Sequence, residues 1–577
     1  MSEPSPLRAD HANLDRVLHA WQARLTAGLS PPAVAAAWGD WLVHLANAPG
    51  KRASLCDLAL TDGVRLGLFA RSLGSEEGPA PFVDMIDGRF SGEAWQRWPF
   101  QLWAQGFLAA ERWWDAATTD VPGVGRQHLR AVNFMTKQAL DLVSPANLPW
   151  ANPEVWDRTL DEGGANLMRG RALWADDLGR LLNERPPAGT EVWRVGEDLA
   201  ATPGAVIFRN DLVELIQYTP TTDDVRPEPV LLVPAWIMKY YILDLREENS
   251  LVRWLVGQGF TVFVLSWKNP GREDAHIGLD DYRRLGVMAA LDVIADVLPD
   301  RQVHGCGYCL GGTLLAIAAA AMARDGDERF RSLTLLAAQT DFSEAGELML
   351  FVDEGEIAFL EDMMWDQGFL ASHQMAGAFR LLRANDLVWS QMIRQYLFGE
   401  RTPVNDLMAW NADGTRMPAR MQTEYLRDLF LDNRLSRARY AVDGRPVALA
   451  DLDLPILAVG TERDHIAPWQ SVYKIRLLTR AEVTFVLASG GHNAGVISEP
   501  GHPHRHHRVG ALAADAAYLA PEAWAAGAAT VDGSWWPTWA AWLHERSSPP
   551  VPPPALGASA TGLPALAPAP GAYVHQR

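Results

Sequence analysis

The segment that decides the fold covers residues 303–322 and reads VHGCGYCLGGTLLAIAAAAM. Its first four residues form a short apolar run that predicts a buried β-strand, and the run from Thr313 to Met322 predicts a helix. Between them lies Gly307-Tyr308-Cys309-Leu310-Gly311, a nucleophile flanked by glycines two positions away on each side. Because glycine has no Cβ, the strand can turn sharply into the helix and hold Cys309 in a strained conformation above the sheet. We therefore expect a nucleophilic sulfur at a helix N-terminus, where the helix dipole favours negative charge.

Short apolar runs on both sides of this segment predict the rest of a sheet. They alternate with helical stretches, which indicates strands buried on both faces of a mostly parallel sheet. Arg209-Asn210-Asp211 joins the first two of these runs as a hairpin. Together with the turn at Cys309, the pattern predicts an α/β-hydrolase fold. The predicted strands are 205–208, 212–218, 230–233, 261–265, 303–306, 332–336, 455–459 and 483–487.

The chain of 577 residues is too long for one ordinary core, so two or three domains are expected. Residues 1–190 carry apolar side chains at three- and four-residue spacing and predict an N-terminal helical domain. Residues 191–340 and 449–546 are predicted to form the α/β core, and the helical stretch 341–448 a cap inserted over the sheet. Residues 547–577 are rich in Pro and Ala, which predicts an extended or disordered tail whose last residues can dock.

Charge and cysteine content exclude several classes of partner. The net charge of -19 repels phosphate backbones and anionic headgroups, so nucleic acid is not an expected partner. No apolar stretch of about 18 uncharged residues occurs, and the N-terminus lacks a basic region before an apolar run, so we expect a cytoplasmic protein without a transmembrane segment. The three cysteines, Cys56, Cys306 and Cys309, are too few for a disulfide framework.

Two residues that follow later strands complete the expected site. A triad on this fold runs in the order nucleophile, acid, histidine. Asp464 follows the strand 455–459, and His492 follows the strand 483–487, each at the carboxyl edge where parallel sheets place reactive groups. The backbone N–H groups of Leu310 and of Trp236, in the loop after strand 230–233, are the expected donors to a developing oxyanion.

Each of these residues also has an interpretation without catalysis. A lone Asp or His is usually structural, and a free cysteine is usually a small buried hydrophobe; their combination with the turn at Cys309 favours a triad. Cys306 and Cys309 also match a redox pair, although Cys306 falls on a buried strand. His502, His504, His506 and His507 resemble a metal cluster, but their irregular spacing favours a solvated surface loop, so no metal is expected.

The sequence resembles the polyhydroxyalkanoate synthases, also called poly(3-hydroxybutyrate) polymerases. The resemblance covers roughly residues 80–577 and is strongest over 200–500, whereas the first 80 residues diverge. Trp236 and Leu279 stand where family members often carry a cysteine and an aromatic residue, which bears on the shape of the pocket. Besides the turn at Cys309, the resemblance is carried by KYYILDL (239–245), NSLVR (249–253), SWKNP (266–270), FVDEG (351–355), RANDLVW (383–389), DHIAPW (464–469), GHNAGVI (491–497) and GSWWP (533–537).

The resemblance implies that Cys309 carries the acyl group, that His492 is its base, and that Asp464 is the third member and helps to deprotonate the 3-hydroxyl of the monomer. It also implies that Arg383 and His465 contact CoA. The implied activity is polymerisation of (R)-3-hydroxyacyl-CoA, with 3-hydroxybutyryl-CoA as the expected monomer, into a polyester with release of CoA. No cofactor is implied, because the CoA thioester is the substrate. A homodimer associated with the polymer granule is implied as well.

Two other functions fit parts of the sequence. A thioesterase or polyester depolymerase would use the same triad to pass acyl groups to water. An inactive granule-associated scaffold protein would keep the fold without the chemistry, and the complete triad argues against it.

Overall fold

The computed structural model describes residues 6–26, 28–73, 87–375, 377, 388–514, 516–558 and 562–577. The chain packs as two compact units, which we call the sheet unit and the helical unit. The sheet unit comprises Met1–Trp21, Thr190–Ala376 and Val404–Arg577, and the helical unit comprises Gln22–Gly189 and Gly377–Pro403. Gly377–Pro403, part of the segment predicted as a cap, thus packs with the N-terminal helices. The domain boundaries given in the sequence analysis stay predictions.

Eleven strands of the described chain form one sheet in the order β14-β13-β12-β11-β6-β5-β3-β4-β2-β1-β15. The six strands from β12 to β4 in this order are parallel, and each strand outside them runs antiparallel to its inner neighbour. All eight predicted strands are confirmed. The bounds are β1 Gly204–Arg209, β2 Val213–Tyr218, β3 Arg226–Val233, β4 Phe260–Trp267, β5 Val303–Tyr308, β6 Phe330–Leu336, β11 Ile456–Thr461, β12 Val483–Ala488, β13 His506–Leu512, β14 Ala529–Asp532 and β15 Ala567–Pro568.

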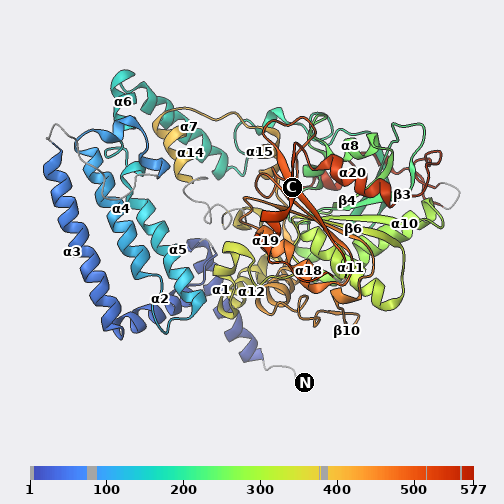
Figure 1. Cartoon of the computed structure of the whole chain (residues 1–577), viewed down its shortest axis with the longest axis horizontal. Helices are drawn as coiled ribbons and strands as arrows, with labels where there is room; N and C mark the ends of the chain where they lie inside the picture. Colours follow the sequence, from blue (N-terminus) through green and yellow to red (C-terminus); the bar gives the residue numbers. More distant parts are fainter. Residues whose placement is uncertain are drawn as a thin grey trace. The chain divides into compact units, whose positions relative to one another are not determined.

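Helices cover both faces of this sheet, which explains why its central strands are apolar throughout. Every residue of β4, β5, β11 and β12 is buried. On one face, α8 (Leu251–Gly257) and α20 (Trp536–Glu545) meet through Trp254 and Trp536, whose ring centroids lie 5.5 Å apart. On the other face, α10 (Ala289–Val297) and α11 (Leu310–Asp325) lie beneath the strands, with α11 packed along β5 and β6 (Figure 1).

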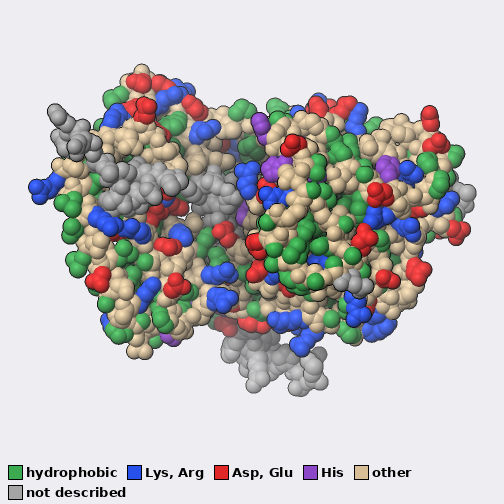
Figure 2. Space-filling model, viewed as in Figure 1, with side chains coloured by type: hydrophobic (Ala, Val, Ile, Leu, Met, Phe, Trp, Pro, Cys, Tyr) green, Lys and Arg blue, Asp and Glu red, His purple; other side chains and the backbone are tan. Residues whose placement is uncertain are grey.

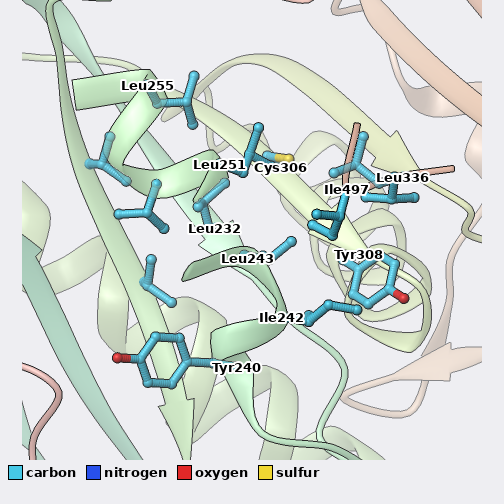
Figure 3. Close-up of a cluster of buried hydrophobic side chains, with 14 of the residues drawn as sticks. Leu232, Tyr240, Ile242, Leu243, Leu251, Leu255, Cys306, Tyr308, Leu336 and Ile497 are labelled. Carbon is cyan, nitrogen blue, oxygen red and sulfur yellow. The ribbon is translucent and has the colours of Figure 1, made fainter. Parts of the chain in front are cut away.

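The core under α8 places one of the two neighbouring cysteines inside the protein. Figure 3 shows Cys306 among Leu232, Leu251 and Leu336, side chains that come from β3, α8 and β6. Cys306 is 2% exposed, and burial raises the pKa of its thiol, so it stays a neutral, packed side chain. This environment fits a core residue rather than one half of a redox pair.

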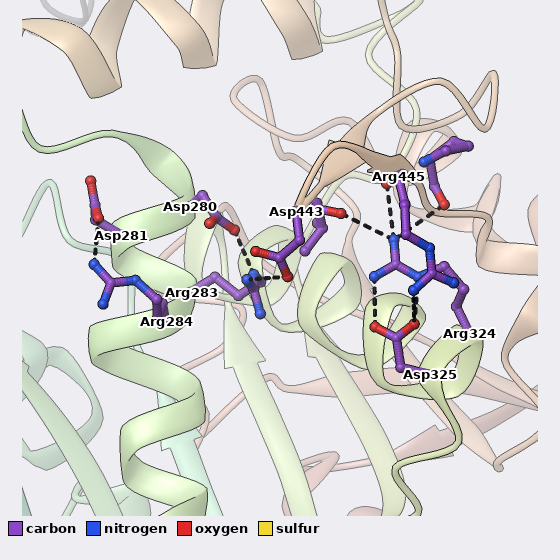
Figure 4. A network of polar contacts seen from close by, with 10 residues as sticks. Asp280, Asp281, Arg283, Arg284, Arg324, Asp325, Asp443 and Arg445 are labelled. Carbon is purple, nitrogen blue, oxygen red and sulfur yellow. Dashed lines mark hydrogen bonds and ion pairs between the residues drawn. The ribbon is translucent and has the colours of Figure 1, made fainter.

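Smaller elements complete the sheet unit. A short hairpin consists of β9 (Ala441–Val442) and β10 (Arg445–Pro446), two residues each. It is bonded to the end of α11, because Arg324 donates to the carbonyls of Val442 and Arg445 (Figure 4). A second pair is β7 (Phe369–Leu370) with β8 (Met417–Pro418). Further described helices of this unit are α1 Pro6–Leu25, which begins in it, α9 Leu279–Asp281, α12 Glu354–Gln367, α15 Asp406–Asn411, α16 Ala419–Glu424, α17 Trp469–Tyr473, α18 Ile475–Leu478 and α19 Pro521–Gly527.

The helical unit confirms the helical prediction for the N-terminal third. Figure 1 shows α2, α3, α4 and α5 side by side. The segment that returns from residue 377 packs on α7, because Asn166 donates to the Leu397 carbonyl at 2.8 Å and Arg401 pairs with Asp177 at 2.7 Å. Its helices are α2 Pro31–Ala46, α3 Pro49–Ser72, α4 Phe100–Ala117, α5 Arg126–Val143, α6 Pro153–Asp161, α7 Ala165–Leu182 and α14 Ser390–Met392.

The histidine-rich segment corrects one prediction. It is not a solvated loop throughout, because β13 begins at His506 and adds to the edge of the sheet beside β12. His507 is 1% exposed and its Nε2 lies 2.9 Å from the Thr538 hydroxyl. Strand addition buries alternate side chains, and that consequence of long-range pairing is invisible in local spacing.

The C-terminal tail is extended, as predicted, and it is docked. β15 pairs with β1, and the side chain of buried Gln217 bonds both Ala555 and Gly557 of the tail. On the face shown in Figure 2, acidic and basic side chains are interspersed. In the described part of the chain, no helix combines the length and apolar character needed to cross a bilayer.

Candidate active site

Cys309 stands at the turn between β5 and α11, in a backbone conformation that few residues adopt. Its φ of 51° and ψ of -123° lie outside the regions favoured by L-residues, so the surrounding packing must hold it there. Its own N–H donates to the Leu336 carbonyl at 2.8 Å, and its carbonyl accepts from Gly312 and Thr313. The side chain is half-buried, in contrast to buried Cys306. This is the predicted strained turn.

The three glycines of this turn are required by close packing. A Cβ on Gly307 would overlap Gly312, and a Cβ on Gly312 would overlap Ala338. A Cβ on Gly311 would overlap the carbonyl oxygens of Val233 and Pro234, the residues at which β3 passes into the next loop. The start of α11 therefore lies against the loop that follows β3.

His492 and Asp464 meet, as the sequence predicts. The Nδ1 of His492 lies 2.7 Å from Oδ2 of Asp464, and both side chains are almost fully buried. The second carboxylate oxygen accepts the backbone N–H groups of Ile466 and Ala467 at 2.9 and 2.8 Å. The Thr461 hydroxyl also donates to Oδ2 at 3.2 Å. With Asp464 held by these four donors, the imidazole is oriented with Nε2 as the nitrogen left to meet another group.

Cys309 interacts with this imidazole. Burial favours a neutral imidazole, but the electrostatic interactions and hydrogen bonds with Asp464 and Cys309 raise the pKa of His492 to about 10. For Asp464, burial would raise the pKa, but the His492 charge and the hydrogen bonds that the carboxylate accepts hold it below its usual value. The three side chains thus form one interacting array, Asp464 to His492 to Cys309.

The loop after β3 stands where an oxyanion site is expected. Leu310 is the first residue of α11, so its N–H has no carbonyl partner within the helix. Trp236 is 1% exposed, and its indole lies 3.1 Å from the Met421 sulfur. The packing of Gly311 on Val233 and Pro234 brings the two N–H groups of the prediction to the same edge of the sheet; their role as donors stays a prediction.

Other residues that brace the site were not found by sequence reasoning. The Tyr308 hydroxyl donates to Asn493 at 2.6 Å, which ties the residue before Cys309 to the residue after His492. The indoles of Trp535 and Trp536 donate to the carbonyls of Gly495 and Val496 in the same loop. The GSWWP block was visible in the sequence, but nothing local shows which loop its tryptophans hold.

The two residues expected to contact CoA have different outcomes. His465 follows Asp464 and is half-buried in the loop after β11. Arg383 lies outside the described residues. Neither expected contact is tested by the arrangement of the described side chains.

Three family models match the chain. A model of the poly-beta-hydroxybutyrate polymerase (PhaC) N-terminus matches residues 86–255, and one of the poly-beta-hydroxybutyrate polymerase N terminal matches residues 9–51. A model of the alpha/beta hydrolase fold matches residues 228–497. The match over residues 9–51 extends the likeness into the first 80 residues. This match corrects the expectation that these residues diverge from the family.

Characterised relatives match over most of the chain. The poly(3-hydroxyalkanoate) polymerase of Methylorubrum extorquens is 41% identical over 514 residues, which cover 88% of this chain and 84% of that protein. The polymerase subunit PhaC of Cupriavidus necator is 36% identical and covers 88% and 86%. Among solved structures, the Paleococcus ferrophilus monoacylglycerol lipase covers 48% of this chain and 90% of its own at 12% identity and a TM-score of 0.30. The fold assignment therefore rests on the strand order and the family model.

Proposed function

This chain belongs to the poly(3-hydroxyalkanoate) polymerase family, and on that premise we propose that Cys309 carries the growing acyl chain as a thioester while His492 and Asp464 manage the protons. The reaction is an acyl transfer that joins 3-hydroxyacyl units, supplied as CoA thioesters, into a polyester. The observation that carries the proposal is the buried array in which Asp464 lies 2.7 Å from His492, and His492 interacts with the strained Cys309.

In the first half-reaction, the proton of the Cys309 thiol passes to His492, and the sulfur attacks the carbonyl carbon of a 3-hydroxyacyl-CoA. The tetrahedral intermediate places its negative oxygen against the N–H groups of Leu310 and Trp236. The carbon–sulfur bond to CoA breaks, and the leaving CoA thiolate takes the proton from His492. The products are acyl-Cys309 and free CoA.

In the second half-reaction, His492, oriented by Asp464, takes the proton of a 3-hydroxyl group from a monomer or from the growing chain. The alkoxide attacks the Cys309 thioester, and the Cys309 thiolate leaves. The proton then moves from His492 to that thiolate, which restores the starting state. One ester bond has formed and one thioester bond has been used.

The test supplies 3-hydroxybutyryl-CoA and measures both CoA release and product mass. Wild type is expected to release CoA and form insoluble polyester, and Cys309→Ala to lose both by at least about 10³-fold. Cys56→Ala removes an exposed thiol of α3 and serves as the matched control with unchanged activity. Free 3-hydroxybutyrate without polymer would favour a thioesterase or depolymerase. CoA release at the same background rate in wild type and Cys309→Ala would favour the scaffold function.

CoA recognition is proposed for His465 and Arg383, whose imidazole and guanidinium can bond phosphate oxygens. His465→Ala is expected to raise the KM for 3-hydroxybutyryl-CoA about tenfold with kcat nearly kept, the loss of about one charge-assisted hydrogen bond. A fall in kcat without a change in KM would show that His465 does not contact CoA.

No metal or prosthetic group takes part in the proposed steps, so EDTA treatment is expected to leave the rate unchanged.

Granule association is proposed to involve α1. Its residues Leu14, Val17, Leu18 and Trp21 are exposed at the spacing of one helix face, while Arg16 and His19 of the same helix pair with Asp362 of α12. Replacing Leu14 and Trp21 by Ser is expected to reduce sedimentation with poly(3-hydroxybutyrate) particles without changing turnover of free substrate. Leu60→Ser, at an exposed position of α3, is the control.

A homodimer is proposed for the assembled enzyme. Sedimentation equilibrium is expected to give about twice the chain mass of 63.5 kDa, and a single-chain mass at all concentrations would contradict it.

A further inference from the structure

The loop after β3 ends in a buried lysine, and among the described residues no carboxylate forms an ion pair with it. Lys239 is 3% exposed, and its Nζ donates to the carbonyls of Tyr573 and Gln576 at 3.2 and 2.7 Å. Both acceptors belong to the C-terminal segment Tyr573–Gln576, which we call the clasp. Burial, reinforced by the nearby Arg416 and Arg577 charges and only partly opposed by Asp413, lowers the pKa of Lys239 to about 8. An ammonium group is rarely buried this deeply, so its few acceptors are important to it.

The clasp also grips the end of β4 and the segment before β8. Gln576 accepts the backbone N–H of Asn269 through its side chain at 2.9 Å. The Asn269 side chain in turn accepts the backbone N–H of Arg416 at 2.9 Å, and the Arg416 guanidinium donates to the Arg577 carbonyl. Lys239 and Asn269 therefore bond Gln576 directly, and the segment before β8 is joined to them through Asn269.

The loop that Lys239 terminates is held at four of its carbonyls. Trp267 donates to Pro234 at 2.9 Å, and the Thr415 hydroxyl donates to Trp236 at 2.5 Å. The Thr415 backbone N–H donates to Ile237 at 3.2 Å, and the Trp410 indole donates to Lys239 at 2.7 Å. Because a peptide group is planar, the held carbonyls of Pro234 and Trp236 fix the N–H groups of Ala235 and Ile237. The peptide that carries the Trp236 N–H therefore lies between two fixed peptides.

We propose that the clasp holds the loop after β3 and the segment 410–417 in the arrangement that presents the oxyanion donors, with Lys239 as the positioning residue. The proposal rests on the proposed function, in which the Trp236 N–H stabilises the tetrahedral intermediate. Lys239 touches no reacting atom in this scheme. It acts by joining the clasp to the loop. Its loss therefore leaves the Trp236 N–H less firmly positioned, while the array of Cys309, His492 and Asp464 remains intact.

The test compares two reactions of the same sulfur in Lys239→Met, a variant of similar length without the ammonium. Acylation of Cys309 by 3-hydroxybutyryl-CoA passes through an oxyanion, whereas alkylation by iodoacetamide does not. Peptide mass spectrometry of a Cys56→Ala background follows both at Cys309. Single-turnover acylation is expected to slow about 10- to 100-fold, with alkylation within twofold of wild type and KM within threefold.

Two further variants complete the test. Lys474→Met removes another mostly buried lysine, which pairs with Glu344 and bonds Ser343, and is expected to change neither reaction. Gln576→Ala weakens the clasp from its other side and is also expected to slow acylation but not alkylation. It tests the proposal by itself if Lys239→Met does not fold. Because both residues act through one clasp, the acylation rate of the double variant is expected to be no lower than that of the slower single variant.

Equal slowing of acylation and alkylation, or acylation at the wild-type rate in both clasp variants, would overturn the positioning role of Lys239. Failure of the proposed function gives a different result, since 3-hydroxybutyryl-CoA would then not acylate Cys309 of the wild type at a rate that matches turnover, whatever the rate of alkylation.

Discussion

The turn at Cys309 and helix α3 both contain glycines, but the glycines have opposite meanings. At the turn, Gly307, Gly311 and Gly312 each face atoms that a Cβ would overlap. In α3, Gly63 and Gly67 face nothing within 4 Å. A glycine in an open helix only weakens the helix, whereas a glycine in a crowded turn permits an approach that no other residue allows. Surrounding density, rather than residue type, decides what a substitution costs.

The largest effect is expected at the chemistry that the turn supports. Asp464→Asn keeps the shape but removes the charge that orients and stabilises protonated His492, so kcat is expected to fall about 10²- to 10⁴-fold. Steady-state CoA release measures it. A loss of kcat below threefold would show that the charge of the buried carboxylate is not needed for catalysis.

The same variant is expected to change the pH dependence of stability. The pKa of His492 is raised to about 10 in the folded protein and is about 6.5 when unfolded. Its contribution to the free energy of unfolding is therefore fully present below about pH 6.5 and is lost as pH rises towards 10. Urea unfolding should show the wild-type advantage over Asp464→Asn shrinking across this window, and parallel curves would contradict it.

Gly311→Ala tests the crowded side of the comparison. The new Cβ would meet the backbone carbonyl of Val233, which cannot rotate away, so α11 or β3 must shift. We expect a loss of about 3 kcal/mol in the free energy of unfolding and at least a tenfold loss of activity. Chemical denaturation and turnover measure the two effects, and a neutral outcome would mean that the turn is looser than described.

Gly67→Ala tests the open side with the same change of one methyl group. The position is exposed inside α3, so alanine should stabilise the helix by about 0.5–1 kcal/mol without altering turnover. Thermal unfolding of the full chain measures it. Destabilisation would indicate a neighbour that packs on this face.

The smallest effect is expected at the surface hairpin of Figure 4. Arg445 pairs with Asp325 at 2.8 Å, but its side chain is 61% exposed, so water and salt screen the pair. Arg445→Ala should change the free energy of unfolding by no more than about 1 kcal/mol. A larger loss would show that the hairpin supports α11 through more than its backbone carbonyls.

The central strands and the turn at Cys309 could be predicted because their signals are local. Apolar runs of strand length report burial on both faces, and the glycine spacing around Cys309 reports a sharp turn. His492 and Asp464 were found by their order after later strands. The burial of His507 was missed, because it depends on β13 pairing with β12 rather than on neighbouring residues.

The tail shows the same limit more strongly. Its Pro-rich composition predicts an extended chain, but composition does not reveal which surface accepts it. Buried Glu214 accepts the N–H groups of Ala572 and Tyr573, and Lys239 donates to Tyr573 and Gln576. Each partner looked like an ordinary charged residue in the sequence.

The amino-acid sequence by itself determined the strand, the turn and the helix around Cys309, because steric limits on φ and ψ act between adjacent residues. Only the tertiary structure decided that Asp464 stands 2.7 Å from His492, that Cys309 interacts with the same imidazole, and that the tail bonds Lys239. Such contacts join residues far apart along the chain, and their geometry depends on how whole strands and helices pack and on which polar groups are removed from water together.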